Sequence, residues 1–201
     1  MKIINDRVAR DIQSGVRINL NLGAGGSSRA GFYNLDKLPL KDVDILADLD
    51  EPLDQLPDNC VSEIHSRHAL EHVGNFLGLM SEIHRITAPD GSIRIIVPHF
   101  SNPYACSDPT HVRFFGLFTM NYFVGRDEQP KRKVHSFYSG VRFHVDSIRI
   151  EFYRQGAIDR VFAPIVRRIV NRSFFWQEFY ERRLCRLFHA WEIVFDMRPV
   201  K

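Results

Sequence analysis

The chain has little cysteine and no long apolar run, which argues against disulfide-rich and membrane-spanning proteins. Its three cysteines, Cys60, Cys106 and Cys185, lie far apart and form no Cys-x-x-Cys pair, which argues against a disulfide framework and a thiolate zinc site. No apolar stretch approaches the roughly 20 residues that span a bilayer. Residues 1–13 contain no apolar signal segment. We therefore expect a cytoplasmic protein in a reducing compartment.

Neither sign of charge predominates, because the formal net charge is only +3 over 201 residues. A charge this small argues against nucleic acid as a partner. Hydrophobic residues make up 44% of the chain and charged residues 25%, as in an ordinary globular protein, which excludes the disordered and fibrous classes. We expect a single domain over residues 1–201. Nothing in the sequence favours a particular oligomeric state.

Short apolar segments that end in glycine or aspartate organise the first half of the chain. Residues 16–22 alternate apolar and polar side chains and run into a glycine turn, which predicts a strand. The pattern predicts one helix over 74–87 and further strands over 32–35, 43–47, 61–66 and 93–97. Because strands and helices alternate and the strands are apolar enough for burial on both faces, we expect a doubly wound, mostly parallel α/β sheet.

The rest of the chain divides into a loop and a basic C-terminal part. Residues 99–140 are rich in histidine, aromatic residues, asparagine and proline, have little periodicity, and predict a substrate loop or lid. Strands are expected over 143–153 and 191–197, paired antiparallel at one sheet edge, with one or two helices over 161–187 between them. The predicted domain therefore consists of a cofactor half (16–98), a lid (99–140) and a C-terminal part (141–201).

Glycine and carboxylate side chains stand where the predicted strands end. Gly23 and Gly25 follow the first strand, and a glycine lets a ligand lie against the backbone. Asp36 ends the second strand, where a carboxylate can accept hydrogen bonds from both ribose hydroxyls. Asp48 ends the third, where it could meet an adenine amino group. Each residue alone also fits a plain turn or a helix cap. Together, at the ligand-binding edge of an α/β sheet, they predict an adenosine site.

Five motifs between residues 18 and 115 follow one order along the chain. They are Leu20-Asn21-Leu22-Gly23-Ala24-Gly25, Gly31-Phe32-Tyr33-Asn34-Leu35-Asp36, Asp48-Leu49, Leu70-Glu71-His72 and Glu82-Ile83-His84-Arg85-Ile86-Thr87-Ala88-Pro89-Asp90-Gly91. Over this half of the chain the sequence resembles the small class I S-adenosylmethionine-dependent methyltransferases. The resemblance implies a Rossmann-like methyltransferase fold and S-adenosyl-L-methionine as the cofactor.

The resemblance also implies which residues contact the cofactor. The glycine turn would border its methionine part, Asp36 its ribose, and Asp48 with Leu49 its adenine. Asn21 stands where many methyltransferases carry an acidic residue, and His68 follows the fourth predicted strand. The expected cofactor-binding residues are Asn21, Gly23, Ala24, Gly25, Asp36, Asp48, Leu49 and His68.

The candidate catalytic residues follow the fifth predicted strand, where segments usually face the acceptor in this fold. Methyl transfer from a sulfonium depends largely on holding the acceptor in line, but a hydroxyl acceptor also needs a histidine or a carboxylate as base. His99, Asp108 and His111 supply both types. Ordinary loop or core histidines are the alternative. We predict that His111 acts as base or substrate anchor for a small-molecule or sugar acceptor.

Two other functions fit parts of the sequence. His68-Ala69-Leu70-Glu71-His72 matches the inverted zinc-protease motif His-x-x-Glu-His, in which one helix presents two imidazoles to zinc and the glutamate acts as general base. This motif directly follows a predicted strand, so we expect no metal and keep a zinc-dependent hydrolase as the alternative. A protein that binds S-adenosylmethionine without catalysis, as a partner subunit, is the second alternative.

Arginines alternate with apolar residues near the C-terminus. They are Arg167, Arg168, Arg172, Arg182, Arg183 and Arg186, among Ile169, Val170, Phe174, Phe175, Trp176, Phe179 and Tyr180. Such helices can pack on the sheet with the arginine stems over apolar surface, lie on an anionic membrane, or contact RNA phosphates. We expect the packed arrangement, with peripheral membrane contact as the first alternative and nucleic acid as the last.

Overall fold

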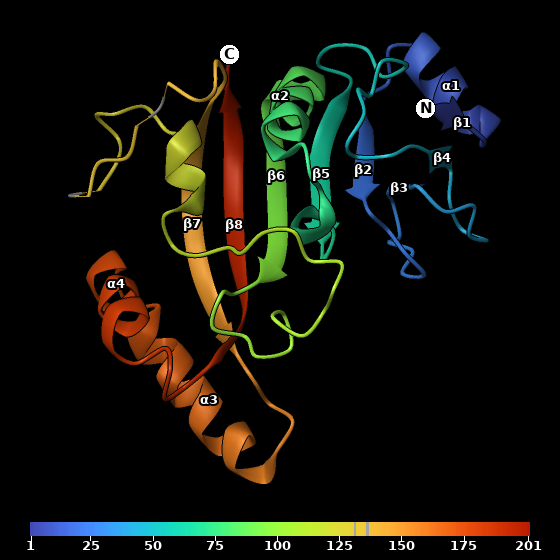
Figure 1. The fold of residues 1–201 in the computed structure, drawn as a ribbon. Coiled ribbons are helices and arrows are strands. Elements are labelled where there is room, and N and C mark those ends of the chain that lie inside the picture. Colours follow the sequence, from blue (N-terminus) through green and yellow to red (C-terminus); the bar gives the residue numbers. More distant parts are fainter. Residues whose placement is uncertain (131, 136) are drawn as a thin grey trace.

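The computed structural model describes residues 1–130, 132–135 and 137–201 (Figure 1). Its strands are β1 (Lys2–Ile3), β2 (Ile18–Leu22), β3 (Tyr33–Asp36), β4 (Ile45–Leu46), β5 (Val61–Arg67), β6 (Thr87–Pro98), β7 (Arg142–Phe152) and β8 (Ala190–Val200). Its α-helices are α1 (Asp6–Gln13), α2 (Phe76–Ile86), α3 (Ala157–Val170) and α4 (Phe174–Arg183), and its 3₁₀ helices are η1 (Leu70–His72) and η2 (Thr119–Phe123). The predicted lid, residues 99–140, carries only η2 among its described residues, and positions 131 and 136 of it lie outside them.

The strands form one sheet in the order β1-β4-β3-β2-β5-β6-β8-β7. The five strands from β4 to β6 run parallel, whereas β1, β8 and β7 each pair antiparallel with their neighbour. This arrangement confirms the predicted mostly parallel α/β sheet with an antiparallel pair at one edge. From β2 the chain turns to β3 and β4 on one side and then returns to place β5 on the other side. Strand order therefore reverses between β2 and β5, and a ligand crevice is expected at their carboxyl ends.

Apolar residues of the central strands and of α2 form the core next to this reversal. Leu20 and Leu22 of β2 and Ile64 of β5 are fully buried. Met80 and Ile83 of α2 pack in the same cluster. The side chain of Asn75 accepts a hydrogen bond from the backbone N–H of Gly78 (3.2 Å), which caps the first turn of α2. The helix is thereby fixed on the sheet directly after η1.

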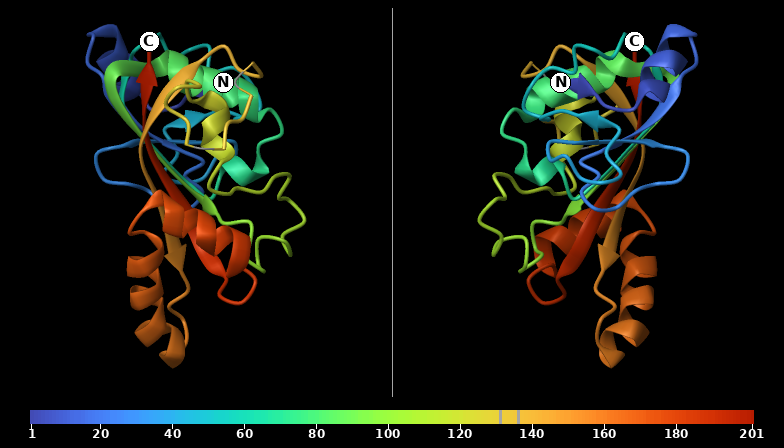
Figure 2. Two further views of the ribbon diagram at one scale, coloured as in Figure 1. Left: turned by 90° about the vertical axis from the view of Figure 1, so that its left-hand side faces the viewer. Right: turned by 90° about the vertical axis from the view of Figure 1, so that its right-hand side faces the viewer.

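The two faces of the sheet are covered differently. Helix α2, η2 and the loop after β6 lie on one side, and α1 lies on the other (Figure 2). Charged pairs occupy one face of β6, β8 and β7: Arg94 Nε lies 2.6 Å from Asp196 Oδ1, and Arg198 Nη2 lies 2.7 Å from Asp146 Oδ1. Alternating buried and charged residues are typical of a half-solvated sheet. Of the strands that were expected to be buried on both faces, β6 is not, because Arg94 on this face is paired with Asp196.

The N-terminal β1 and α1 were not among the predicted elements. Helix α1 buries Val8 and is otherwise mainly polar, so its apolar pattern is too weak to detect. The side chain of Asn5 accepts a hydrogen bond from the backbone N–H of Arg7 (3.0 Å) and caps it. Among the described residues, none of the helices combines the length and the apolar character that crossing a bilayer requires.

Candidate functional site

A crevice of about 400 Å³ opens at the carboxyl ends of β2, β3 and β5. Of the eight expected cofactor-binding residues, those that line it are Gly23, Gly25, Asp36, Asp48, Leu49 and His68. The lining residues that sequence reasoning missed include Lys37, Asp50, Ala69, His72, Val73 and Thr110. The available signal was position in the chain: His72 ends the Leu-Glu-His motif, and Thr110 lies between the candidate residues Asp108 and His111. The structure thus brings the glycine turn and both aspartates to one cavity at the strand-order reversal.

The glycine turn after β2 has a backbone that only glycine adopts without strain. Gly23 and Gly25 have φ values of +65° and +54°. A Cβ on Gly23 would lie 2.2 Å from the Cβ of Ala69, so the turn is in direct contact with the segment that follows β5. At Gly25 nothing lies within 4 Å of the Cβ position, and the backbone is open to the crevice.

The carboxylate of Asp36 connects the end of β3 to the glycine turn. Its Oδ2 accepts a hydrogen bond from the backbone N–H of Gly25 (2.8 Å), and its Oδ1 accepts one from the N–H of Leu38 (2.9 Å). Asp48 Oδ1 accepts a hydrogen bond from the N–H of Asp50 (3.0 Å). Both aspartates are therefore fixed by local backbone groups in the wall of the crevice.

His68 contributes a positive charge to the crevice. Its φ is +54°, an uncommon backbone conformation for a residue other than glycine. Its Nε2 lies 2.5 Å from Glu192 Oε1 and its Nδ1 lies 3.4 Å from Glu71 Oε1. Burial alone would lower the pKa of His68, but the carboxylates of Glu192 and Glu71 outweigh it and raise the pKa to about 9. The imidazole is therefore charged at neutral pH.

Asn21 and Ala24 border an adjoining cavity of about 410 Å³ on the other side of the glycine turn, not the crevice itself. The side-chain amide of Asn21 donates to Asn34 Oδ1 (3.0 Å) and to the carbonyl of Ser27 (3.2 Å). Its oxygen lies 3.1 Å from Nδ1 of His65. Because these groups are hydrogen-bonded to one another, Asn21 holds the loop after the glycine turn in place.

The segment that matches the inverted zinc-protease motif does not form the helix that this motif needs. Only Leu70–His72 are helical, as the 3₁₀ turn η1, and His68 lies outside it with a positive φ. His68 faces Glu192, whereas Nδ1 of His72 lies 2.9 Å from Thr110 Oγ1. The two imidazoles are not presented together, so the zinc-hydrolase alternative is wrong in its required geometry.

His99 lies apart from the crevice. Its side chain is fully buried, with Nδ1 2.8 Å from Ser101 Oγ and Nε2 3.1 Å from Glu181 Oε1. Both ring nitrogens are occupied by these partners, and the ring packs against Phe100 and Tyr180. The expectation that His99 faces the acceptor is therefore not met, and its contacts are those of a core histidine that anchors the loop after β6.

Asp108 and His111 lie beside the crevice, next to two residues that line it. The ring of His111 packs edge-on against His72, with 4.7 Å between the ring centroids. Asp108 Oδ2 lies 3.7 Å from His111 Nε2, and Asp108 Oδ1 accepts a hydrogen bond from Thr110 Oγ1 (2.6 Å). Hydrogen bonds from the side chain and backbone of Thr110 lower the pKa of Asp108. This arrangement keeps a carboxylate and two imidazoles at the edge of the crevice.

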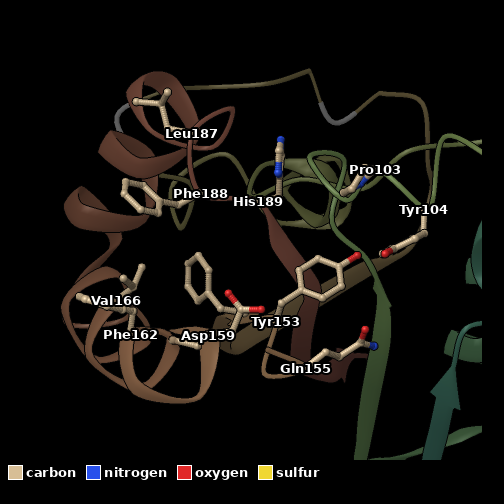
Figure 3. Close-up of a pocket in the computed structure, with 12 residues that line it drawn as sticks. Pro103, Tyr104, Tyr153, Gln155, Asp159, Phe162, Val166, Leu187, Phe188 and His189 are labelled. Carbon is tan, nitrogen blue, oxygen red and sulfur yellow. The ribbon is translucent and has the colours of Figure 1, made fainter. Parts of the chain in front are cut away.

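An aromatic cavity of about 370 Å³ lies near the crevice, between the end of β7, α3 and the loop after β6 (Figure 3). Tyr104 and Tyr153 stand on one side of it, and Phe162 and Phe188 on the other. The ring of Trp191 lies between this cavity and the crevice, with its centroid 4.7 Å from that of Tyr153 and 6.2 Å from that of His68. Sequence reasoning missed this cavity, because its walls come from three separate parts of the chain, within 103–104, 152–166 and 187–189.

Helices α3 and α4 pack on the body of the protein through one side only. Val170 and Tyr180 are buried, and Gln177 Nε2 donates to the carbonyl of Ile148 (2.6 Å). The other side leaves an apolar surface exposed, the helical patch, which consists of Val161, Phe162, Ile165, Ile169, Phe175, Trp176 and Phe179. The two helices therefore pack on the rest of the protein as expected, but the helical patch stays exposed to solvent.

Comparisons with known proteins agree with this fold. A structural neighbour from Archaeoglobus fulgidus, described as a SAM-dependent methyltransferase, aligns with a TM-score of 0.52 at 19% identity over 96% of this chain and 91% of its own. The YcgJ protein from Bacillus subtilis aligns with a TM-score of 0.55 at 13% identity over 98% of both chains. No protein-family model and no curated protein matches the sequence. The chain has the fold of a solved S-adenosylmethionine-dependent methyltransferase.

Proposed function

We propose that this protein is an S-adenosylmethionine-dependent methyltransferase that acts on a hydroxyl group of a small molecule or glycan. The observation that carries the proposal is the convergence of Gly25, Asp36 and Asp48 in one crevice at the reversal of strand order. A cavity of about 400 Å³ falls in the size range of small-ligand sites. The fold of the neighbours supports the same function.

The residues of the crevice fit this cofactor. Bound S-adenosylmethionine supplies a methyl group that is activated by the sulfonium. Asp36, at the end of β3, would accept hydrogen bonds from the ribose hydroxyls, and Asp48 with Leu49 would border the adenine. The open backbone at Gly25 leaves room for the methionine part, because no atom lies where a Cβ would stand.

The acceptor is proposed to enter from the side of the crevice that carries His111. His111 and Asp108 lie at this edge, where they would anchor a hydroxyl in line with the methyl group. The aromatic cavity would hold the rest of the acceptor, because Tyr104 and Tyr153 offer flat apolar rings with polar ends, which suit a sugar ring or an aromatic group. Burial raises the pKa of Tyr153 to about 12, so its hydroxyl stays protonated and donates to Oδ1 of Asn102 (2.6 Å), which fixes the ring in the wall of the cavity.

Calorimetric titration with S-adenosylhomocysteine tests the cofactor. We expect one site per chain and an affinity about tenfold or more weaker in Asp36→Ala, since charge-assisted hydrogen bonds contribute about 1.5–3 kcal/mol. Asp54→Ala, an exposed carboxylate away from the crevice lining, is the matched control and should bind normally. No binding by the unaltered chain, or equal binding by Asp36→Ala, contradicts the proposal. Binding without turnover on a broad panel of hydroxyl acceptors indicates the non-catalytic alternative.

We also propose that the helical patch contacts an anionic lipid surface. Phe175 and Val161 are 66% and 63% exposed, and this many exposed large apolar side chains on two neighbouring helices indicate an interaction surface. Arg168 of α3, Arg183 of α4 and Arg172 in the turn between them are exposed and match the sign of anionic headgroups. Phe162 of α3 belongs to the helical patch and also lines the aromatic cavity. An acceptor held at a membrane surface could therefore enter this cavity.

Co-sedimentation with vesicles tests the membrane contact. Vesicles with anionic lipid should pellet the protein at low salt, neutral vesicles should pellet much less, and higher salt should reduce the bound fraction several-fold. Phe175→Glu should abolish sedimentation, whereas Leu77→Glu, an exposed apolar residue on α2, should leave it unchanged. Equal sedimentation of both variants would remove the helical patch from the proposal.

A further inference from the structure

Three side chains of metal-ligating type meet beside the crevice. Glu71, His72 and His111 each offer one ligand atom, and these atoms lie within 4.8 Å of one another. Glu71 and His72 belong to η1, and His111 lies in the loop after β6, so the cluster exists only in the folded chain. The proposed function assigns no role to Glu71 or His72.

Glu71 is the buried carboxylate of the cluster. Its side chain is 1% exposed, and within the part of the chain that the structure describes neither carboxylate oxygen accepts a hydrogen bond. The nearest cationic atom is Nδ1 of His68, 3.4 Å from Oε1. Burying a carboxylate without hydrogen bonds is costly, and buried charges are normally paired or bound to metal. Oε1 of Glu71 therefore faces the charged His68, whereas no hydrogen bond from the described residues occupies Oε2, which can still bind a metal ion.

His72 has the tautomer that a metal ligand requires. Nδ1 of His72 lies 3.3 Å from the carbonyl oxygen of Thr110 and 2.9 Å from its Oγ1. A carbonyl oxygen only accepts, and the Thr110 hydroxyl donates its own proton to Asp108 Oδ1 (2.6 Å), so the proton between the ring and Thr110 belongs to Nδ1. Nε2 of His72 therefore carries a lone pair. Metal-bound histidines commonly have this type of hydrogen bond on the other ring nitrogen.

We propose that Glu71, His72 and His111 bind a divalent transition-metal ion at the edge of the crevice. Two imidazoles and one carboxylate form the ligand set of catalytic zinc sites, which keep a further position for water or substrate. His72 and Thr110 line the crevice, so that position faces the proposed methyl acceptor. There the ion would lower the pKa of a bound hydroxyl, and His111 would anchor the acceptor through the metal. The ligands differ from those of the inverted protease motif, because His68 is not among them.

Metal binding itself is independent of the proposed function, whereas the use of the ion on an acceptor rests on it. The full chain, freed of metal by a chelator, is titrated with Zn²⁺ by calorimetry, and Co²⁺ absorption reports the coordination geometry. We expect one site, with affinity at least about tenfold weaker in Glu71→Gln and in His111→Ala. His84→Ala, which removes a histidine of α2 outside the cluster, is the control and should bind as the unaltered chain does.

Several outcomes overturn the metal site. They are the absence of Zn²⁺ binding, equal binding by His111→Ala and the unaltered chain, or a loss in His84→Ala as large as in His111→Ala. Glu71→Gln keeps the shape of the side chain, and the His111 side chain, although only 9% exposed, lies in a loop, so His111→Ala decides the matter if Glu71→Gln fails to fold. Titration with S-adenosylhomocysteine separates the two proposals: affinity that is unchanged in His111→Ala, together with lost Zn²⁺ binding, leaves the cofactor site intact.

Discussion

Gly23 connects the folding of the sheet to the shape of the crevice. Its φ of +65° places the turn after β2 against the segment after β5, and the Cβ of Ala69 fills the space that a side chain would need. The absence of a side chain at Gly23 therefore lets the segment after β5 pack directly on the turn after β2.

Gly23→Ala should lower the free energy of unfolding by about 2–4 kcal/mol, because overpacking adds to the strain of a positive φ. Gly15→Ala is the matched control: Gly15 has a φ of +75° but nothing within 4 Å of its Cβ position, so only the backbone strain, about 1–2 kcal/mol, should be lost. Urea denaturation measures both. Equal losses in the two variants would contradict the steric part of the argument.

His65 makes stability depend on pH. Burial, with a smaller effect of Arg29, lowers its pKa to about 4 from an ordinary 6.5. Between these values the unfolded chain binds a proton that the folded chain does not, so stability falls as the pH drops from 6.5 to 4. The slope from this group is at most about 1.4 kcal/mol per pH unit. His65→Gln should have a shallower dependence in this window, measured by denaturation at each pH. An unchanged slope would assign the pH effect to other groups.

At the scale of elements, Arg85 fastens α2 to the turn before β5. Its Nη1 donates to the carbonyl of Leu56 (2.7 Å) and its Nη2 to the carbonyl of Leu53 (3.1 Å). Glu82, one turn earlier in α2, accepts from Nη2 of Arg85 (2.7 Å) and from the N–H of Leu53 (2.8 Å). The Glu-x-x-Arg motif thus has a structural role at the end of the sheet opposite the crevice.

Arg85→Lys should lower the free energy of unfolding by about 2 kcal/mol, because a lysine cannot reproduce the guanidinium fork on two carbonyls and a carboxylate. Affinity for S-adenosylhomocysteine should stay unchanged, since Arg85 does not line the crevice. Arg17→Lys, at the exposed pair with Asp90, is the control and should change stability by less than about 1 kcal/mol. Chemical denaturation and calorimetry together separate these effects. A loss of cofactor affinity would contradict the structural assignment.

At the scale of the whole molecule, the crevice joins segments that are far apart in the chain. Its walls come from the segments that follow β2, β3, β4, β5 and β6, and Trp191 of β8 contacts both His68 in the crevice and Tyr153 in the aromatic cavity. A ligand that binds these walls therefore stabilises the whole sheet and not one element of it.

S-adenosylhomocysteine at 100 times its dissociation constant should raise the free energy of unfolding by about 2.7 kcal/mol. For a chain of this size this corresponds to a rise in Tm of about 5–10 °C. Asp36→Ala should lose most of the rise at the same ligand concentration, while Asp54→Ala should keep it. Differential scanning calorimetry measures the shift, and a Tm that does not respond to ligand in the unaltered chain would count against the cofactor site.

The sequence by itself determined the sheet and the edge at which the crevice lies. Glycine after β2 and aspartates after β3 and β4 stand at strand ends, and in a parallel sheet the carboxyl ends meet at one edge whatever the details of packing. Periodicity located α2 and the antiparallel pair β7 and β8 for the same reason, because burial pattern and strand period are local properties.

Only the tertiary structure decided which polar residues face the crevice. The histidines after β6 look alike in sequence, yet His99 is buried beneath Glu181 and His111 lies beside His72, because long-range contacts orient the loop that carries both. The pairing of His68 with Glu192, which is 124 positions away, is equally invisible to local patterns. The direction of a side chain and the charges around it depend on residues distant in the chain, so they are fixed only in the folded protein.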